Sequence, residues 1–96
     1  MQAVLKSNGK TVATSDDTTY IEGNQYFPID TVDMSIVTES DTQYHCPWKG
    51  DAKYYNLDDQ KDAMWQYPNP LPSAEVKVKK DISNLVAFDP TLVEVS

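Results

Sequence analysis

The stretch AKYYNLDDQKDAMWQY, residues 52–67, decides the fold. Its first six and last five residues alternate in polarity and carry aromatic side chains, which is typical of β-strands. The five polar residues between these runs are a connection of hairpin length. Successive side chains of a strand point to opposite faces, so Tyr54 and Trp65 form an aromatic wall if the two runs share a face.

Short runs of the same kind recur along the chain between turn residues. Asn8-Gly9 separates two such runs, and this dipeptide is a strong hairpin signal because both residues accept positive φ. Thr18–Glu22 and Gln25–Phe27 lie on either side of Gly23-Asn24, and Leu85–Phe88 begins a closing pair. We therefore predict a mainly β fold: a small antiparallel β-sandwich or barrel-like domain spanning residues 1–96, with one or two short helices.

Two segments are candidates for helix. Asp30–Val37 has a capping aspartate and an apolar face, which predicts a helix of at most two turns. Thr38–Asp41 is polar and is expected to be a loop. Residues 74–84 stay open between an exposed edge strand and one or two helical turns capped by Ser73.

Composition restricts the classes of partner. The 96 residues carry 15 acidic and 8 basic side chains, a formal charge of −7, so the basic face that a nucleic-acid partner needs is not expected. No apolar run is long enough to span a membrane, and the N-terminus does not read as a signal peptide. A single cysteine forms no internal disulfide. We expect an acidic cytoplasmic protein without a nucleic-acid or membrane partner.

The chain's single histidine and single cysteine are adjacent, at His45-Cys46. Structural zinc needs four ligands, usually in spaced pairs, and adjacent strand residues point apart, so no metal and no cofactor are expected. Cys46 is either a catalytic nucleophile or a buried thiol, and His45 is either a general base or a structural residue. Pro47–Gly50 is expected to form a turn from which Lys49 and one of His45 and Cys46 look outward, while the other faces the core.

Three motifs resemble those of the domain-of-unknown-function family 427, a group of small, mostly bacterial, β-rich proteins. They are EGNQYFP at Glu22–Pro28, HCPWKGDAKYY at His45–Tyr55, and WQYPNP at Trp65–Pro70. Nearly the whole chain fits the resemblance. Asn84-Leu85 replaces a Gly-aromatic pair usual in the family, and the connection at Asp58–Asp62 is shorter than in many relatives.

The resemblance implies a site more than a reaction. The family sometimes carries a nucleotidyltransferase label, but three glycines and no glycine-rich loop argue against it here. If the motifs converge, they form a polar-aromatic pocket for a small, potentially anionic molecule. Its expected lining residues are Glu22, Tyr26, His45, Lys49, Tyr54, Trp65 and Tyr67.

Within that pocket, His45, Cys46 and Glu22 are the catalytic candidates. Lys49 would meet an anionic group, and Glu22 with His45 could exchange a proton. The alternatives are a protein-interaction module without catalysis, in which the same aromatics form a core or a partner surface, and a nucleotidyltransferase-like or Cys46-dependent enzyme.

Overall fold

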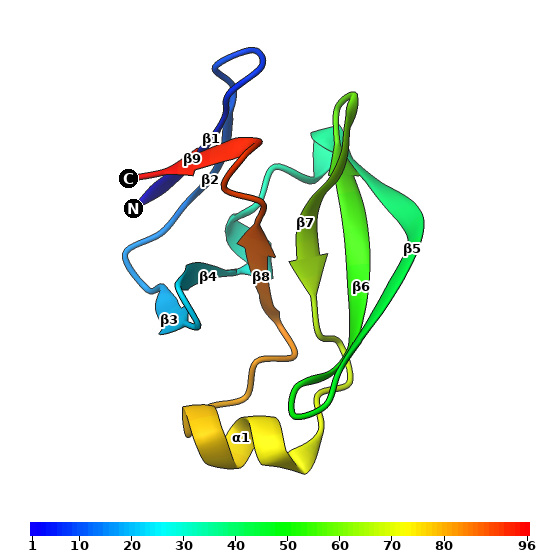
Figure 1. Cartoon of the computed structure of the whole chain (residues 1–96). Coiled ribbons are helices and arrows are strands. Elements are labelled where there is room, and N and C mark those ends of the chain that lie inside the picture. Colours follow the sequence, from blue (N-terminus) through cyan, green and yellow to red (C-terminus); the bar gives the residue numbers. More distant parts are fainter.

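The computed structural model describes all residues from Met1 to Ser96. It contains nine strands, one α-helix and two 3-10 turns (Figure 1). The strands are β1 (Gln2–Leu5), β2 (Thr11–Thr14), β3 (Thr19–Ile21), β4 (Asn24–Pro28), β5 (Val37–Cys46), β6 (Gly50–Leu57), β7 (Gln60–Gln66), β8 (Leu85–Phe88) and β9 (Val93–Val95). The 3-10 turns are Ile29–Thr31 and Met34–Ile36, and the helix is α1 (Pro72–Val78). No helix has the length and apolar character needed to cross a membrane.

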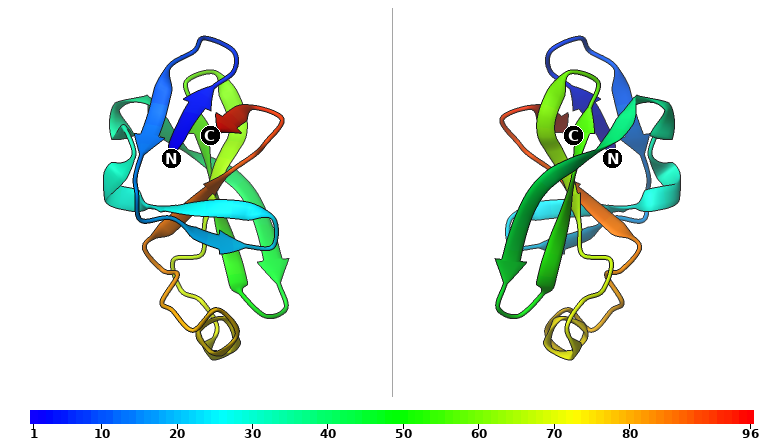
Figure 2. Two further views of the ribbon diagram at one scale, coloured as in Figure 1. Left: turned by 90° about the vertical axis from the view of Figure 1, so that its left-hand side faces the viewer. Right: turned by 90° about the vertical axis from the view of Figure 1, so that its right-hand side faces the viewer.

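The strands form two antiparallel sheets. A three-stranded sheet has the order β2-β1-β9, and a six-stranded sheet has the order β3-β4-β8-β7-β6-β5. Both sheets remain open and no barrel closes. Figure 2 shows from the sides how the small sheet and α1 lie at opposite ends of the molecule. The predicted mainly β, antiparallel fold with a short helix is therefore confirmed.

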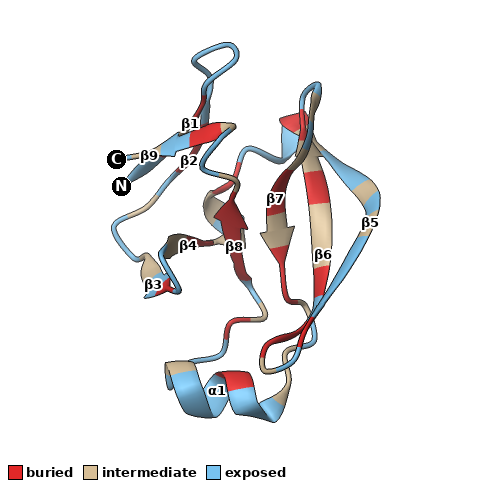
Figure 3. Ribbon diagram, in the orientation of Figure 1, coloured by how far each residue is buried: buried red, intermediate tan, exposed pale blue.

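The six-stranded sheet carries an apolar core on each face, because its central strands are apolar at consecutive positions. In β8, Val86 and Phe88 belong to the first core, whereas Leu85 and Ala87 belong to the second. The first core lies between the two sheets and includes Leu5 of the small sheet. Figure 3 shows β8 buried along its length. The sheet therefore has no purely solvated face at its centre.

The second core lies on the face that α1 covers. Ala74 and Val78 of the helix contact it, together with Ile82 from the following loop. A seven-residue helix shields less area than a sheet does, so this face stays partly open. Five of its aromatic side chains are buried or half-buried, namely Tyr26, Trp48, Tyr54, Trp65 and Tyr67. Most aromatic residues of the sequence motifs thus gather on one face, whereas Phe27 and Tyr55 belong to the first core.

The predicted central hairpin is present. Tyr54 of β6 lies directly opposite Trp65 of β7, so the two runs share a face as the alternation required. The connection is shorter than expected, because the turn contains only Asp58 and Asp59. Asp58 accepts the positive φ of this turn, at 52°. β7 therefore begins at Gln60, within the predicted loop.

Two local predictions are wrong. Asp30–Val37 forms two separate 3-10 turns instead of one helix, because Val32 between them makes a β-bridge with Ala13. Thr38–Asp41 is not a loop but part of β5, which pairs with β6. In both places pairing with a distant strand overrides the local preference.

Part of the segment left open between strand and helix, residues 74–84, is helical; it follows a proline-rich loop at residues 68–71. Pro72 begins α1, where its missing N–H is tolerated. Lys79 ends the helix in the left-handed conformation, at φ 62°. The remaining residues up to Leu85 form no regular element.

Candidate functional site

Lys49 is the most unusual side chain on the second face, because its ammonium group is removed from water. The residue is 8% exposed. Its Nζ lies 2.6 Å from Oε1 of Glu22, a residue 27 positions earlier in the chain. The expectation that Lys49 looks outward from the turn is therefore wrong. The acidic partner and the aromatic rings around Lys49 make its burial tolerable.

The turn that carries Lys49 is fixed by the proline-rich loop. Gly50 has φ +112°, and a Cβ at this position would approach the Asn69 carbonyl oxygen to 3.3 Å. The Leu71 N–H donates to the Lys49 carbonyl oxygen over 3.0 Å. Ser73 Oγ likewise donates to the Trp48 carbonyl oxygen over 2.7 Å. Glycine after Lys49 thus allows the loop to approach closely and hold the turn.

Glu22 occupies an uncommon backbone conformation. It forms the β3–β4 turn with Gly23, and both residues have positive φ, at 49° and 88°. Hairpins of this kind favour Asn and Gly at these positions, so a glutamate there is strained. Its side chain is 53% exposed although it is bonded to a buried ammonium ion. One member of the ion pair is therefore sheltered while the other stands at the surface.

Aromatic rings surround the Lys49 ammonium group. Its Nζ lies 5.1 Å from the centroid of the Trp48 ring and 5.0 Å from that of Tyr67. Distances of this size allow attraction between the cation and the ring faces. Lys49 therefore stands among rings as well as beside a carboxylate.

A second aromatic group continues the same face. The Trp65 indole N–H donates to the Tyr26 hydroxyl over 3.2 Å. The Trp65 and Tyr54 rings lie 6.0 Å apart and are tilted by 40°. Both of these rings are half-buried, so their outer edges reach solvent. We call the set Glu22, Tyr26, Trp48, Lys49, Tyr54, Trp65 and Tyr67 the Lys49 cluster.

At neutral pH the surroundings of the cluster keep Lys49 protonated. Burial would lower the pKa of Lys49, but the Glu22 carboxylate and the Tyr26 and Tyr67 hydroxyls raise it well above its ordinary value. Burial raises the pKa of Tyr67 to about 12, although the Lys49 charge opposes this. Burial is also the main cause of the raised pKa of Tyr54. Lys49 is thus a cation, and Tyr54 and Tyr67 are neutral.

These shifts predict a loss of stability at high pH. Unfolded lysine and tyrosine release protons near pH 10.5 and 10.0, before the folded groups do. Above pH 10 the folded state therefore binds more protons than the unfolded state, and the free energy of unfolding falls. Between pH 9 and 11.5, urea titrations of Tyr67→Phe should show a fall about 1–2 kcal/mol smaller than in the parent protein. Identical falls would contradict the assignment to Tyr67.

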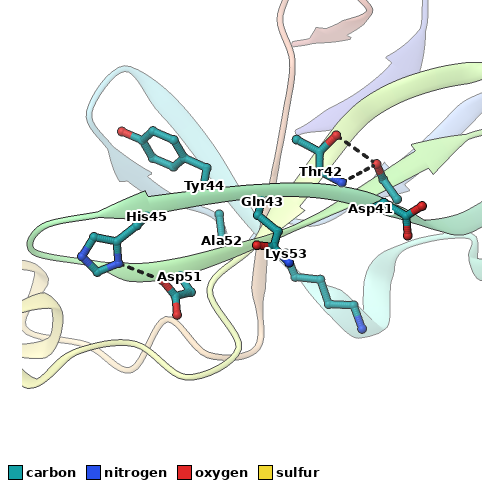
Figure 4. A pocket seen from close by; sticks show the side chains of 9 residues that line it. Asp41, Thr42, Gln43, Tyr44, His45, Asp51, Ala52 and Lys53 are labelled. Carbon is teal, nitrogen blue, oxygen red and sulfur yellow. Dashed lines mark hydrogen bonds and ion pairs between the residues drawn. The ribbon is translucent and has the colours of Figure 1, made fainter.

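His45 does not join this cluster. Its Nδ1 lies 2.8 Å from Oδ1 of Asp51, the residue opposite it on β6, and both side chains are exposed. They line a polar hollow of about 610 Å³ on β5 and β6 (Figure 4). In this view the Tyr44 ring lies on the other side of the strand. The grouping of His45 with Glu22 and Lys49 is therefore not what the structure shows, because β5 directs His45 to the outer side.

Cys46 faces the second core and is 5% exposed. Its neighbour His45 points to the opposite side of β5, so the two side chains do not act as a nucleophile and base pair. This arrangement agrees with a buried thiol. No group of three or more His, Cys, Asp or Glu side chains is arranged to hold a metal ion.

A bulge interrupts β5 beside the hollow, where the register with β6 shifts between Glu39 and Gln43. The hydroxyls of Ser40 and Thr42 both donate to the Asp62 carboxylate, over 2.5 and 2.6 Å. Burial would raise the pKa of Asp62, but these hydroxyl donors and Lys61 hold it below its ordinary value. The bulge is therefore fixed by an ionised carboxylate on β7.

Three residues were not among the predicted site residues: Trp48 of the Lys49 cluster, Lys77 beside it, and Gln66, which is bonded to Tyr55 of the first core. Trp48 lies beside Lys49 in the motif His45–Tyr55, and this position next to a predicted site residue could have indicated it. Lys77 of α1 places its Nζ 4.4 Å from the Trp48 ring centroid. This contact depends on the position of α1, which the sequence does not give. Gln66 is 7% exposed, accepts from the Tyr55 hydroxyl and donates to the Ser83 carbonyl oxygen. No local pattern indicates that this glutamine is buried.

Comparison with known proteins gives a family and no activity. A search of curated proteins found no match. A family model described as "Domain of unknown function (DUF427)" matches residues 2–96. The match includes every residue of the Lys49 cluster and of the polar hollow. Because it covers nearly the whole chain, the protein belongs to the DUF427 family.

Proposed function

We propose that this protein binds a small planar molecule with an anionic group at the Lys49 cluster. The anion takes the place of the Glu22 carboxylate on the Lys49 ammonium group. The ring of the ligand lies against the half-buried edges of Tyr54 and Trp65. The observation that carries this proposal is a sheltered ammonium ion whose carboxylate partner is itself 53% exposed.

The asymmetry of the ion pair distinguishes a binding site from a purely structural contact. A buried ammonium ion needs an anion beside it, because its own hydration has been lost. Glu22 supplies this anion from a strained surface turn, and rotation of its side chain returns its carboxylate to water. A ligand anion can therefore replace Glu22 without leaving a buried charge unpaired.

The aromatic residues favour a planar ligand. Rings bury apolar area at low conformational cost and stack on other rings in offset or tilted geometries. Tyr54 and Trp65 are half-buried, so additional apolar area is available to a ligand. None of the three main hollows is lined by a residue of the Lys49 cluster. Binding therefore requires the Glu22 side chain to swing away.

The test is a titration followed by ¹H–¹⁵N NMR with benzoate as the probe and benzyl alcohol as its neutral counterpart. Benzoate should shift the amide signals of Glu22, Gly23 and Lys49 and the Trp65 indole N–H, and benzyl alcohol should bind more weakly. Lys49→Met keeps most of the apolar stem and should weaken benzoate binding at least about tenfold.

Two further variants sharpen the test. Glu22→Gln removes the competing charge and should strengthen benzoate binding. His45→Ala should leave it unchanged, because His45 lies on the other side of β5. The proposal fails if benzoate causes no shifts at these residues, if Lys49→Met binds it normally, or if Glu22→Gln weakens its binding.

A second candidate function is a protein-interaction module, which the exposed side chains of Val76 and Tyr20 favour, at 77% and 68% exposure. These residues lie on α1 and on β3, so a partner would cover elements beside the Lys49 cluster. A partner contact there would be lost in Val76→Asp, whereas benzoate binding would persist.

A further inference from the structure

We infer that the anionic group recognised at the Lys49 cluster is a phosphomonoester, bound between Lys49 and Lys77. This inference rests on the proposed function and names its ligand class. It starts from the Trp48 ring, which has two ammonium groups close to it. Lys49 Nζ lies 5.1 Å from the ring centroid and Lys77 Nζ lies 4.4 Å from it. The two cations come from separate elements, the β5–β6 turn and α1.

The shared ring limits how far apart the two ammonium groups can be. Their separation cannot exceed the sum of the two distances to the Trp48 centroid, and Lys77 is exposed, so its long side chain can move toward a ligand held at Lys49. Like charges at this range repel each other, and solvent screens the exposed Lys77 more than the buried Lys49. An anion between them would replace this repulsion with two attractions.

Too little negative charge is present to neutralise the pair. Glu22 is bonded to Lys49, and Lys77 makes no ion pair with any carboxylate. Lys80, also near α1, is occupied by Asp17 and the Thr19 hydroxyl. The chain as a whole carries a formal charge of −7, so an unpaired lysine beside a buried one is a local excess of positive charge.

A phosphomonoester matches this arrangement better than a carboxylate does. It carries close to two negative charges at pH 7 and has three strong acceptor oxygens. Lysine binds phosphate as a point charge and needs no planar, two-pronged contact. A carboxylate carries one charge and would replace Glu22 on Lys49 without neutralising Lys77.

The test compares phenyl phosphate with benzoate in the same NMR titration at pH 7.5. Both probes carry a ring, but phenyl phosphate is close to a dianion. Phenyl phosphate should bind at least about tenfold more tightly than benzoate. Inorganic phosphate should bind more weakly than phenyl phosphate, because it has no ring to contact Tyr54 and Trp65.

The Lys77→Gln variant should reduce the preference for phenyl phosphate over benzoate to threefold or less, because it removes the second ammonium group. It should weaken the binding of phenyl phosphate more than that of benzoate. Lys61→Gln, at an exposed lysine on β7, is the matched control for net charge and should behave like the parent protein. Lowering the pH from 7.5 to 5.5 should weaken phenyl phosphate binding several-fold, since the second phosphate ionisation lies near pH 6.

The outcomes separate the two proposals. If neither benzoate nor phenyl phosphate binds at the Lys49 cluster, the proposed function fails. If both bind there with equal affinity, or if Lys77→Gln leaves the preference unchanged, the phosphomonoester inference fails and the proposed function stands. An equal loss in Lys61→Gln would also overturn the inference, because it would show an effect of net charge alone.

Discussion

Replacing Phe27 with alanine is expected to lower the free energy of unfolding by about 3–5 kcal/mol. Phe27 is fully buried in the core between the two sheets. Its ring meets the Phe88 ring edge to face, with centroids 5.5 Å apart and planes at 73°. Sheets packed on one another cannot easily close over the space a lost ring leaves, so the cavity remains.

Denaturation by urea, followed by tryptophan fluorescence, measures this loss. Phe27→Leu is the control, because it keeps most of the volume and should lose less than about 1.5 kcal/mol. A small domain has only about 5–15 kcal/mol of stability, so Phe27→Ala removes a large part of it. A loss below about 1 kcal/mol would show that Phe27 is not enclosed as described.

Replacing Gln66 with alanine is expected to lower the free energy of unfolding by about 2–4 kcal/mol. The Gln66 amide accepts from the Tyr55 hydroxyl over 3.0 Å and donates to the Ser83 carbonyl oxygen over 2.7 Å. Without it, the largely buried Tyr55 hydroxyl loses its acceptor and the Ser83 carbonyl loses a donor. The cost comes mainly from these polar groups being left without partners.

A double-mutant cycle identifies the cause. Tyr55→Phe removes the hydroxyl that Gln66→Ala would leave without an acceptor. In the Tyr55→Phe background, Gln66→Ala should therefore lower the free energy of unfolding by at least about 0.5 kcal/mol less than in the parent protein. Gln43→Ala, on the exposed side of β5, is the control and should change stability by less than about 0.5 kcal/mol. Strict additivity of the Tyr55 and Gln66 losses would rule out a shared hydrogen-bond network.

The parts of the fold that follow from local rules could be predicted. Asn8-Gly9 lies in the β1–β2 connection, where Gly9 has φ +72°. The alternation in β6 and β7 places Tyr54 opposite Trp65. Segments whose structure depends on a distant partner could not be predicted. Thr38–Asp41 has the composition of a loop, yet its pairing with β6 makes it a strand.

The candidate site shows the same division. The motifs indicate which residue types are present, and the alternation of a strand predicts that His45 and Cys46 point to opposite sides. Neither shows which side of β5 faces the core. The burial of Lys49 depends on the β3–β4 turn, which delivers Glu22 from 27 residues away. The motif around Lys49, His45–Tyr55, does not include Glu22 and so gives no sign of this contact. The role of the Lys49 cluster in binding stays a prediction.

The bulge in β5 has a consequence for how separate molecules meet. β5 is a ten-residue strand at the free edge of the six-stranded sheet, and such edges invite pairing with a neighbouring chain. A bulge held by Asp62 breaks the regular spacing of backbone donors and acceptors that a second strand would need. The low pKa of Asp62 keeps this carboxylate ionised in mild acid. One carboxylate on β7 thus holds the neighbouring edge strand in a shape that disfavours pairing with a second chain.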